Sequence, residues 1–191
     1  MVSHNADDVL MFWFGSRGGD EPRTEWFKKD ATFDAEISAR FGALIDSALA
    51  GGLTHWMADA HGALARILLL DQFTRNTGRD TPRAFAGDAL ALVAARAMVA
   101  AGHDMALTPV QRSFVYLPFE HSENLAAQRE GLMHFAVLAW QHPARAAAFE
   151  WALKHYDIVV RFGRYPHRNA ALGRASTAAE LEFLAQPGSS F

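Results

Sequence analysis

The sequence contains no cysteine, which excludes a disulfide framework, thiolate-bound zinc and a cysteine nucleophile. Its amino terminus lacks the basic start and apolar stretch of a signal peptide, so we expect a cytoplasmic protein. No window holds the ~20 uninterrupted apolar residues that a membrane span requires. We therefore expect a soluble protein without a membrane partner.

Positive charge is also scarce, because 18 lysines and arginines face 21 acids and the formal net charge is −3. With this mild acidity and no extended basic face, nucleic acid is not an expected partner. No two histidines are three or four residues apart and Glu-x-x-His does not occur. We therefore expect neither a metal site nor a cofactor.

No stretch alternates at period two for long enough to form a strand, whereas helical patterns are frequent. Asn5 is placed to cap a helix that Gly15 ends. The apolar positions between Phe33 and Leu49 trace one helical face, and residues 63–73 are apolar almost all round, as in the middle of a bundle. We predict a single all-α domain over residues 1–191, with about eight helices in antiparallel pairs.

Other residues predict where helices begin and which side chains are buried. Thr81-Pro82 indicates a helix that runs to Ala101, and Thr108-Pro109 indicates a short one that Pro118 interrupts. Ser122 is expected to cap the next helix, with Glu123 in its first turn. Thr177 and Glu180 have the spacing of a capping box for the last helix. Four tryptophans are expected in the core: Trp13, Trp56, Trp140 and Trp151.

Residues 161–174 carry four arginines, one histidine and no acid, a formal charge of +4 in a chain whose total is −3. We expect this segment to meet two other polar segments, residues 71–76 and 119–124. Guanidinium groups suit carboxylates and phosphates, so the three segments are candidates for an anion-binding groove. The structural alternative is that the arginines pair with carboxylates of this chain, those of Asp71, Glu120, Glu123 and Asp157.

The leading hypothesis is a binding protein that takes a small anionic molecule or an acidic peptide end. Its candidate ligand-binding residues are Asp71, Arg75, Asn76, Arg112, Tyr116, His121, Arg161, Arg164, His167, Arg168, Asn169 and Arg174. Asp71 ends the most apolar helix and should have a partner, either Arg75 or an arginine of residues 161–174.

Two other functions stay open. The first is a hydrolytic enzyme in which His121 or His167 acts as general base, with Glu123 as a further catalytic candidate. Ser122 is not the expected nucleophile, because the side chains of neighbouring residues diverge. His155 is expected to be a core histidine whose hydrogen bonds are satisfied. The second function is a scaffold that binds another protein.

The chain closely resembles the uncharacterised bacterial family known as domain of unknown function 924. The resemblance covers essentially the whole chain and rests on residues 9–15, the segment from Trp26-Phe27 to Phe33-Asp34, 68–73, 75–76, 84–86, 118–119, 121–123, Gln128, 161–169, 172–174 and 176–177. It implies a tetratricopeptide-like α-α superhelix and no known reaction or catalytic residues. Thr74 stands where the family usually has proline, and Asn124 stands where an acid is usual.

Overall fold

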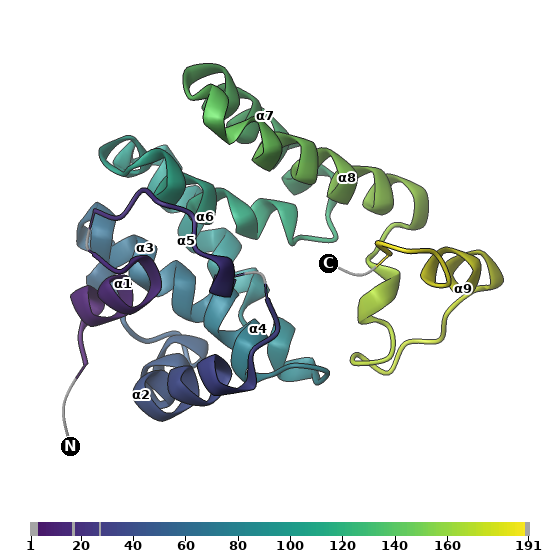
Figure 1. Cartoon of the computed structure of the whole chain (residues 1–191), viewed down its shortest axis with the longest axis horizontal. Coiled ribbons are helices and arrows are strands. Elements are labelled where there is room, and N and C mark those ends of the chain that lie inside the picture. Colours follow the sequence, from purple (N-terminus) through teal and green to yellow (C-terminus); the bar gives the residue numbers. More distant parts are fainter. Residues whose placement is uncertain (1–3, 17, 27, 190–191) are drawn as a thin grey trace.

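The structure is a computed structural model that describes residues 4–16, 18–26 and 28–189, so Phe27 lies outside it. The described residues form helices and no strand, which confirms the all-α prediction (Figure 1). The α-helices are α1 Ala6–Phe14, α2 Ala31–Leu49, α3 Ala60–Leu68, α4 Thr74–Thr77, α5 Asp88–Ala100, α6 Pro109–Glu120, α7 Leu125–Gln141, α8 Ala146–Phe162 and α9 Ala178–Leu184. Among them is no helix with the length and apolar character needed to cross a bilayer.

The predicted helix ends are correct where a local side chain or a glycine decides them. Asn5 forms a capping box with Asp8 at α1. The helix ends at Gly15, whose φ of 75° is in the left-handed region that favours glycine. Thr177 and Glu180 form the predicted capping box of α9.

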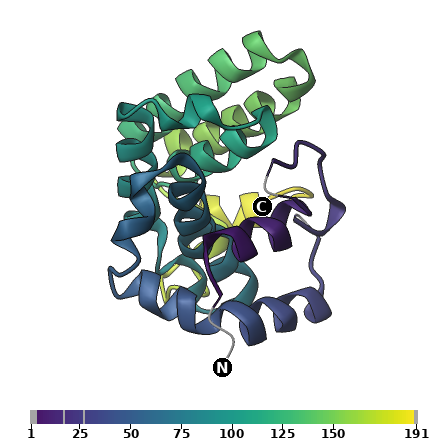
Figure 2. The ribbon, with the colours of Figure 1, turned by 90° about the vertical axis from the view of Figure 1, so that its left-hand side faces the viewer.

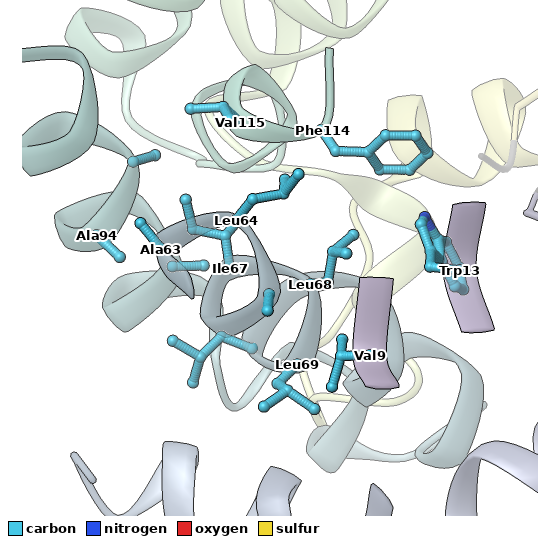
Figure 3. Close-up of a cluster of buried hydrophobic side chains, with 14 of the residues drawn as sticks. Val9, Trp13, Ala63, Leu64, Ile67, Leu68, Leu69, Ala94, Phe114 and Val115 are labelled. Carbon is cyan, nitrogen blue, oxygen red and sulfur yellow. The ribbon is translucent and has the colours of Figure 1, made fainter. Parts of the chain in front are cut away.

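A central rod runs from Ala60 to Thr77, because α3, a π-helical turn over Leu69–Phe73 and α4 follow one another without a break. Leu64, Leu68 and Leu69 are completely buried. Side chains from α1, α5 and α6 surround the rod, and α2 packs against its second half (Figure 3). A helix that is apolar on all sides is stable only with neighbours on all sides, so the prediction for this segment is confirmed.

The helices α6, α7 and α8 pack one after another, and α7 lies at one end of the molecule (Figures 1 and 2). After α8, the chain turns at Gly163 and residues 163–184 fold back. A small apolar cluster of Ile158, Val159 and Tyr165, with Phe162 and Phe183 beside it, joins this returning segment to α8. The segment with most of the arginines is therefore held against the bundle.

Two predicted helices differ from those in the structure. The helix expected from Thr81 is divided into a 3-10 turn, Pro82–Phe85, and α5, which begins at Asp88. The division lies at Gly87, where an added Cβ would be 2.0 Å from the carbonyl oxygen of Leu70, so this backbone packs directly on the rod. The helix α6 continues through Pro118 to Glu120, because proline removes only one hydrogen bond there and the next residue is held in the core.

Ser122 is not the cap of α7. The cap is Asn124, whose Oδ1 accepts hydrogen bonds from the backbone N–H groups of Ala126 (2.9 Å) and Ala127 (3.2 Å). Ser122 Oγ accepts the N–H of Asn124. Glu123 is therefore not part of the first turn of α7, and its side chain is available for another partner.

The core assignment is correct for Trp13 and Trp56 and wrong for the other two tryptophans. Trp140 is 83% exposed and Trp151 is 50% exposed. Both lie on the outward sides of α7 and α8, where helical position and not side-chain type decides exposure.

Candidate functional site

Three polar segments that are distant in the sequence meet in space, as predicted. His121 Nδ1 lies 2.7 Å from Asp71 Oδ1, which joins the second segment to the first. Glu123 Oε2 accepts a 2.6 Å hydrogen bond from Arg174 Nη1. Glu123 Oε1 accepts the backbone N–H of Tyr165 at 2.8 Å, so the third segment is joined as well. We call this meeting point the junction.

Asp71 is at the centre of the junction and is completely buried. The π-helical turn of the rod carries it. Its carboxylate lies 3.0 Å from Arg75 Nη1 and accepts a 2.6 Å hydrogen bond from Gln72 Nε2, in addition to its contact with His121. Burial opposes ionisation, but the positive charge of Arg75 and the hydrogen bonds of His121 and Gln72 outweigh it and lower the pKa of Asp71. The group is therefore a buried carboxylate, with Arg75 as the predicted partner.

His121 follows the last residue of α6, and 13% of its side chain is exposed. Burial, and then the positive charge of Arg75, lower its pKa, so the imidazole is neutral at pH 7. A neutral ring beside a carboxylate carries its proton on the facing nitrogen, Nδ1. Nε2 then has a free lone pair, and it makes no hydrogen bond to a described residue.

A second carboxylate, Asp88, links two arginines across the junction. Its Oδ1 and Oδ2 accept hydrogen bonds from Arg75 Nη1 (3.0 Å) and Nη2 (3.2 Å), and Oδ2 also accepts one from Arg168 Nη1 (3.0 Å). The buried Arg168 guanidinium lies 4.7 Å from the ring centre of Phe85 and 4.5 Å from that of Tyr165. Negative and positive side chains thus alternate across the junction, in the order Asp71, Arg75, Asp88 and Arg168, and their charges balance.

Behind these charges lies an uncharged pair, Glu120 and His155, with Oε1 and Nδ1 3.1 Å apart. Burial, and then the negative charge of Asp71, raise the pKa of Glu120 to about 8. Burial lowers the pKa of His155 to about 3, and its Nδ1–H donates to the carbonyl oxygen of Trp151 at 2.9 Å. His155 is thus the satisfied core histidine that the sequence predicts.

The returning segment is held by carboxylates, as the structural alternative predicted for it. Arg174 pairs with Glu123, Arg168 with Asp88, and Arg164 with Glu180, whose Oε1 lies 2.6 Å from Arg164 Nε. Of the four predicted partners, only Glu123 receives one of these arginines. Most of the positive charge that the sequence suggested for a ligand is therefore neutralised within the protein.

Arg161 differs from the other three arginines. Its guanidinium carbon lies 4.7 Å from the ring centre of Phe162 and 5.8 Å from that of Phe183. The guanidinium forms no ion pair with a carboxylate of the residues that the structure describes. Arg161 also lines a surface hollow beside α9, together with Phe162, Arg164, Thr177, Ala179 and Glu180. The hollow is separate from the residues that surround Asp71.

The remaining predicted site residues have other contacts. Asn76 donates to Asp34 at 2.7 Å, and Arg112 donates to Gln141 at 3.0 Å. Tyr116 donates to Asp104 at 2.6 Å, and burial followed by this bond raises its pKa to about 12. These partners are outside the junction.

Two other predicted residues belong to the returning segment. Asn169 Oδ1 accepts from Arg174 Nε at 3.0 Å. The ring of His167 lies 5.6 Å from that of Tyr165, and burial, then the charge of Arg168, lower its pKa to about 3. Both residues therefore support the segment that reaches the junction.

Two contributors were not predicted. Asp88 interrupts an alanine-rich run, and an isolated acid at the start of a helix could have indicated a partner. Gln128 was noted only as part of the family resemblance. Its Nε2 donates to the carbonyl oxygen of Ser122 at 2.6 Å and to the hydroxyl of Tyr165 at 2.7 Å. No set of three histidine or acidic residues suited to a metal ion occurs in the described part of the chain.

Comparison with known proteins agrees with the predicted resemblance. A family model described as a bacterial protein of unknown function, DUF924, matches residues 9–188. A solved structure of a protein of unknown function, ATU0120 from Agrobacterium tumefaciens, is similar to this chain, with 39% sequence identity and a TM-score of 0.82 over 94% of this chain and 96% of that chain. No curated protein matches at a significant level. Because the family model covers nearly all of the sequence, the chain belongs to the DUF924 family of bacterial proteins.

Proposed function

We propose that the junction is an acid–base site for the hydrolysis of a small molecule, with His121 as the general base. The observation that carries the proposal is the 2.7 Å contact between Asp71 Oδ1 and His121 Nδ1. A buried carboxylate on one imidazole nitrogen fixes the tautomer and stabilises the imidazolium that forms when the other nitrogen takes a proton. His121 is also the partly exposed member of the pair, so it is the one that can reach solvent or substrate.

The proposed hydrolysis requires no side-chain nucleophile. No serine, threonine or tyrosine hydroxyl is hydrogen-bonded to His121 in the described parts of the chain. Water is therefore the nucleophile: its oxygen attacks the electrophilic atom while its proton moves to His121 Nε2. The same proton then passes to the leaving group, which restores the neutral imidazole.

The ion pairs behind His121 keep this base ready to react. Arg75 binds both Asp71 and Asp88, so Asp71 stays ionised although it is buried. An imidazole that is neutral at pH 7 can accept a proton at once. Because the charges of the junction are balanced, this chemistry is better supported there than the capture of a free anion.

A second function is favoured by one separate observation, the lack of a carboxylate partner for Arg161 within the described part of the chain. We propose that the surface hollow beside α9 takes a small anion, because the Arg161 guanidinium is supported by two aromatic rings and has no carboxylate partner among the described residues. Titration with inorganic phosphate tests it: chemical shifts of residues around Arg161 should move with the native protein and not with Arg161→Gln. Equal shifts in both proteins would exclude this site.

The tautomer of His121 is the first test of the acid–base site. Long-range ¹H–¹⁵N spectra of the native protein at pH 7 should show that His121 is neutral and carries its proton on Nδ1. In Asp71→Asn, the amide can donate to the ring, so the preference for this tautomer should weaken. A His121 ring that is protonated on Nε2, or charged at pH 7, would contradict the proposed role.

The second test is activity on p-nitrophenyl acetate and p-nitrophenyl phosphate, with purified native protein. Hydrolysis should fall at least tenfold in His121→Gln and should persist in His103→Gln, a change at a histidine of a distant 3-10 turn. Equal rates in the native protein and His121→Gln would show that the base is elsewhere.

A further inference from the structure

The outward side of α7 is unusually apolar. Four large apolar side chains are exposed along it: Leu125 at 37%, Met133 at 66%, Val137 at 44% and Trp140 at 83%. Contiguous apolar surface of this kind on a soluble protein marks an interaction site more often than scattered single residues do. The helix lies at one end of the molecule (Figures 1 and 2), and these exposures show that no element of the described residues covers this side.

The spacing of this stripe suits helix pairing. Ala126, Met133 and Trp140 are each seven residues apart, and Val137 lies between the last two. A seven-residue repeat keeps one seam of a helix facing a partner helix over several turns. From Ala126 to Trp140 the seam is roughly 21 Å long at 1.5 Å per residue, which is enough for a helix–helix contact.

Charge is almost absent from the seam. Arg129 is exposed and has no ion pair with a described residue, whereas the neighbouring Glu130 is bound to Arg96. An arginine at the side of an apolar seam can cover a partner's side chain with its aliphatic stem while its charge stays in water. The stripe is therefore one apolar surface with a single positive group at its edge.

We propose that α7 is the interface of a symmetric dimer, in which it packs antiparallel against α7 of a second copy with Met133 at the two-fold axis. In that register Trp140 lies opposite Ala126 of the other copy, so a large side chain faces a small one at both ends. Val137 lies opposite Arg129, and the two Arg129 residues are kept apart. A surface that complements itself in this way is what a two-fold interface requires.

The exposed area agrees with such a contact. Trp140 alone offers on the order of 200 Å², since a buried aromatic side chain covers 150–250 Å². With the other exposed side chains of the stripe, each copy contributes roughly 500–700 Å², slightly below the ~800 Å² per partner of a standard interface. We therefore expect a dimer that dissociates on dilution. This inference is independent of the chemistry proposed for His121.

Sedimentation velocity of the full chain over a range of concentrations tests the dimer. The native protein should approach twice the 21.0 kDa protomer mass as concentration rises. Met133→Asp places two carboxylates at the axis and should sediment as a monomer at every concentration. Val93→Asp changes a residue of similar exposure, 65%, on another helix and should still dimerise. A monomeric native protein, or a dimer that Met133→Asp leaves unchanged, would overturn the proposal.

Cross-linking gives the register. Because the chain has no cysteine, Met133→Cys introduces one thiol, and two such thiols at the axis are near enough to form a disulfide. Mild oxidation should convert Met133→Cys to a covalent dimer much faster than Val93→Cys. Equal rates for the two variants would exclude the antiparallel contact centred on Met133, whether or not the protein is a dimer.

Discussion

Asp71 and His121 are 50 residues apart in the sequence and share a 2.7 Å contact between Oδ1 and Nδ1. The contact exists only when the rod and the end of α6 are packed together, because each helix supplies one partner. The residues that could perform chemistry are therefore also residues that hold the bundle together. Mutations at the junction should change stability as well as any activity.

Asp71→Asn should lower the free energy of unfolding by about 3 kcal/mol, since it breaks a buried charge pair and leaves Asp88 as the carboxylate partner of Arg75. Urea unfolding followed by circular dichroism measures this loss. The matched control is Asp80→Asn, at a side chain that is 88% exposed, where the change should be below ~0.5 kcal/mol. Equal stability of the two variants would mean that Asp71 is not ionised in the folded protein.

Glu120→Gln should remove a loss of stability that occurs as the pH rises from 4.5 to 8. Burial, then the charge of Asp71, raise the pKa of Glu120 from 4.5 to about 8, so between these values the folded protein holds a proton that the unfolded chain has lost. Its contribution to stability is therefore present below pH 4.5 and is lost as the pH rises to 8, by about 1.4 kcal/mol per pH unit. Between pH 6.5 and 8 the native protein should lose stability and the variant should not.

The loss of stability at acid pH has another origin. Burial lowers the pKa of both His155 and His167 from 6.5 to about 3, so the unfolded chain binds more protons than the folded protein between these values. Stability should fall as the pH falls from 6.5 to 3, in the native protein and in Glu120→Gln alike. We expect the highest stability of the native protein near pH 6.5. In unfolding curves measured from pH 4 to 9, a maximum above pH 8 would contradict the raised pKa of Glu120, and a stability that does not fall below pH 6.5 would contradict the lowered pKa values of the two histidines.

Arg174→Ala should loosen the returning segment. The variant loses both hydrogen bonds to Glu123, and because each side chain is about one quarter exposed, we expect a cost of about 1–2 kcal/mol. Hydrogen exchange should accelerate at residues 163–174 more than in α3. The control Arg129→Ala removes an arginine that forms no ion pair with the residues that the structure describes. It should leave hydrogen exchange at residues 163–174 unchanged.

Gly87→Ala and Gly42→Ala form a matched pair of substitutions with opposite outcomes. At Gly87 the new Cβ would be 2.0 Å from a backbone oxygen of Leu70, so we expect destabilisation of about 3 kcal/mol. At Gly42, within α2, an added Cβ would have no described atom beyond the neighbouring helix backbone within 4 Å, and alanine should stabilise the helix by up to ~1 kcal/mol. Thermal unfolding of both variants measures these changes in stability. A neutral Gly87→Ala would show that the division before α5 does not depend on this close packing.

Local chemistry made much of the fold predictable. Asn5 and Thr177 cap helices through their own side chains, and Gly163 can take the positive φ that ends α8, so a few neighbouring residues are sufficient to locate these ends. Ser122 and Asn124 are both good caps two residues apart. Helix-capping propensity alone does not choose between them. With Asn124 as the cap, Glu123 stays outside α7 and its side chain binds the distant Arg174.

The site was less predictable than the fold, because its members are partners over long sequence distances. The sequence indicated that three polar segments would meet, and Asp71 with Arg75 followed from helical spacing. Asp88 could not be assigned to both Arg75 and Arg168 without knowing that α5 begins beside the rod. The exposure of Trp140 depends on which side of α7 faces its neighbours, and a weakly patterned helix does not show this.

The π-helical turn at Leu69–Phe73 gives the rod one residue more than an unbroken α-helix of the same path would contain. The turn takes up that residue within its own length, so loss of one residue there would leave an unbroken α-helix in which the following side chains keep their directions. Arg75 would then still face Asp88, whereas side chains of the turn itself, Asp71 among them, would shift while the rod remained helical. A change of length by one residue, and not a substitution, is thus the simplest genetic event that could create or abolish this arrangement.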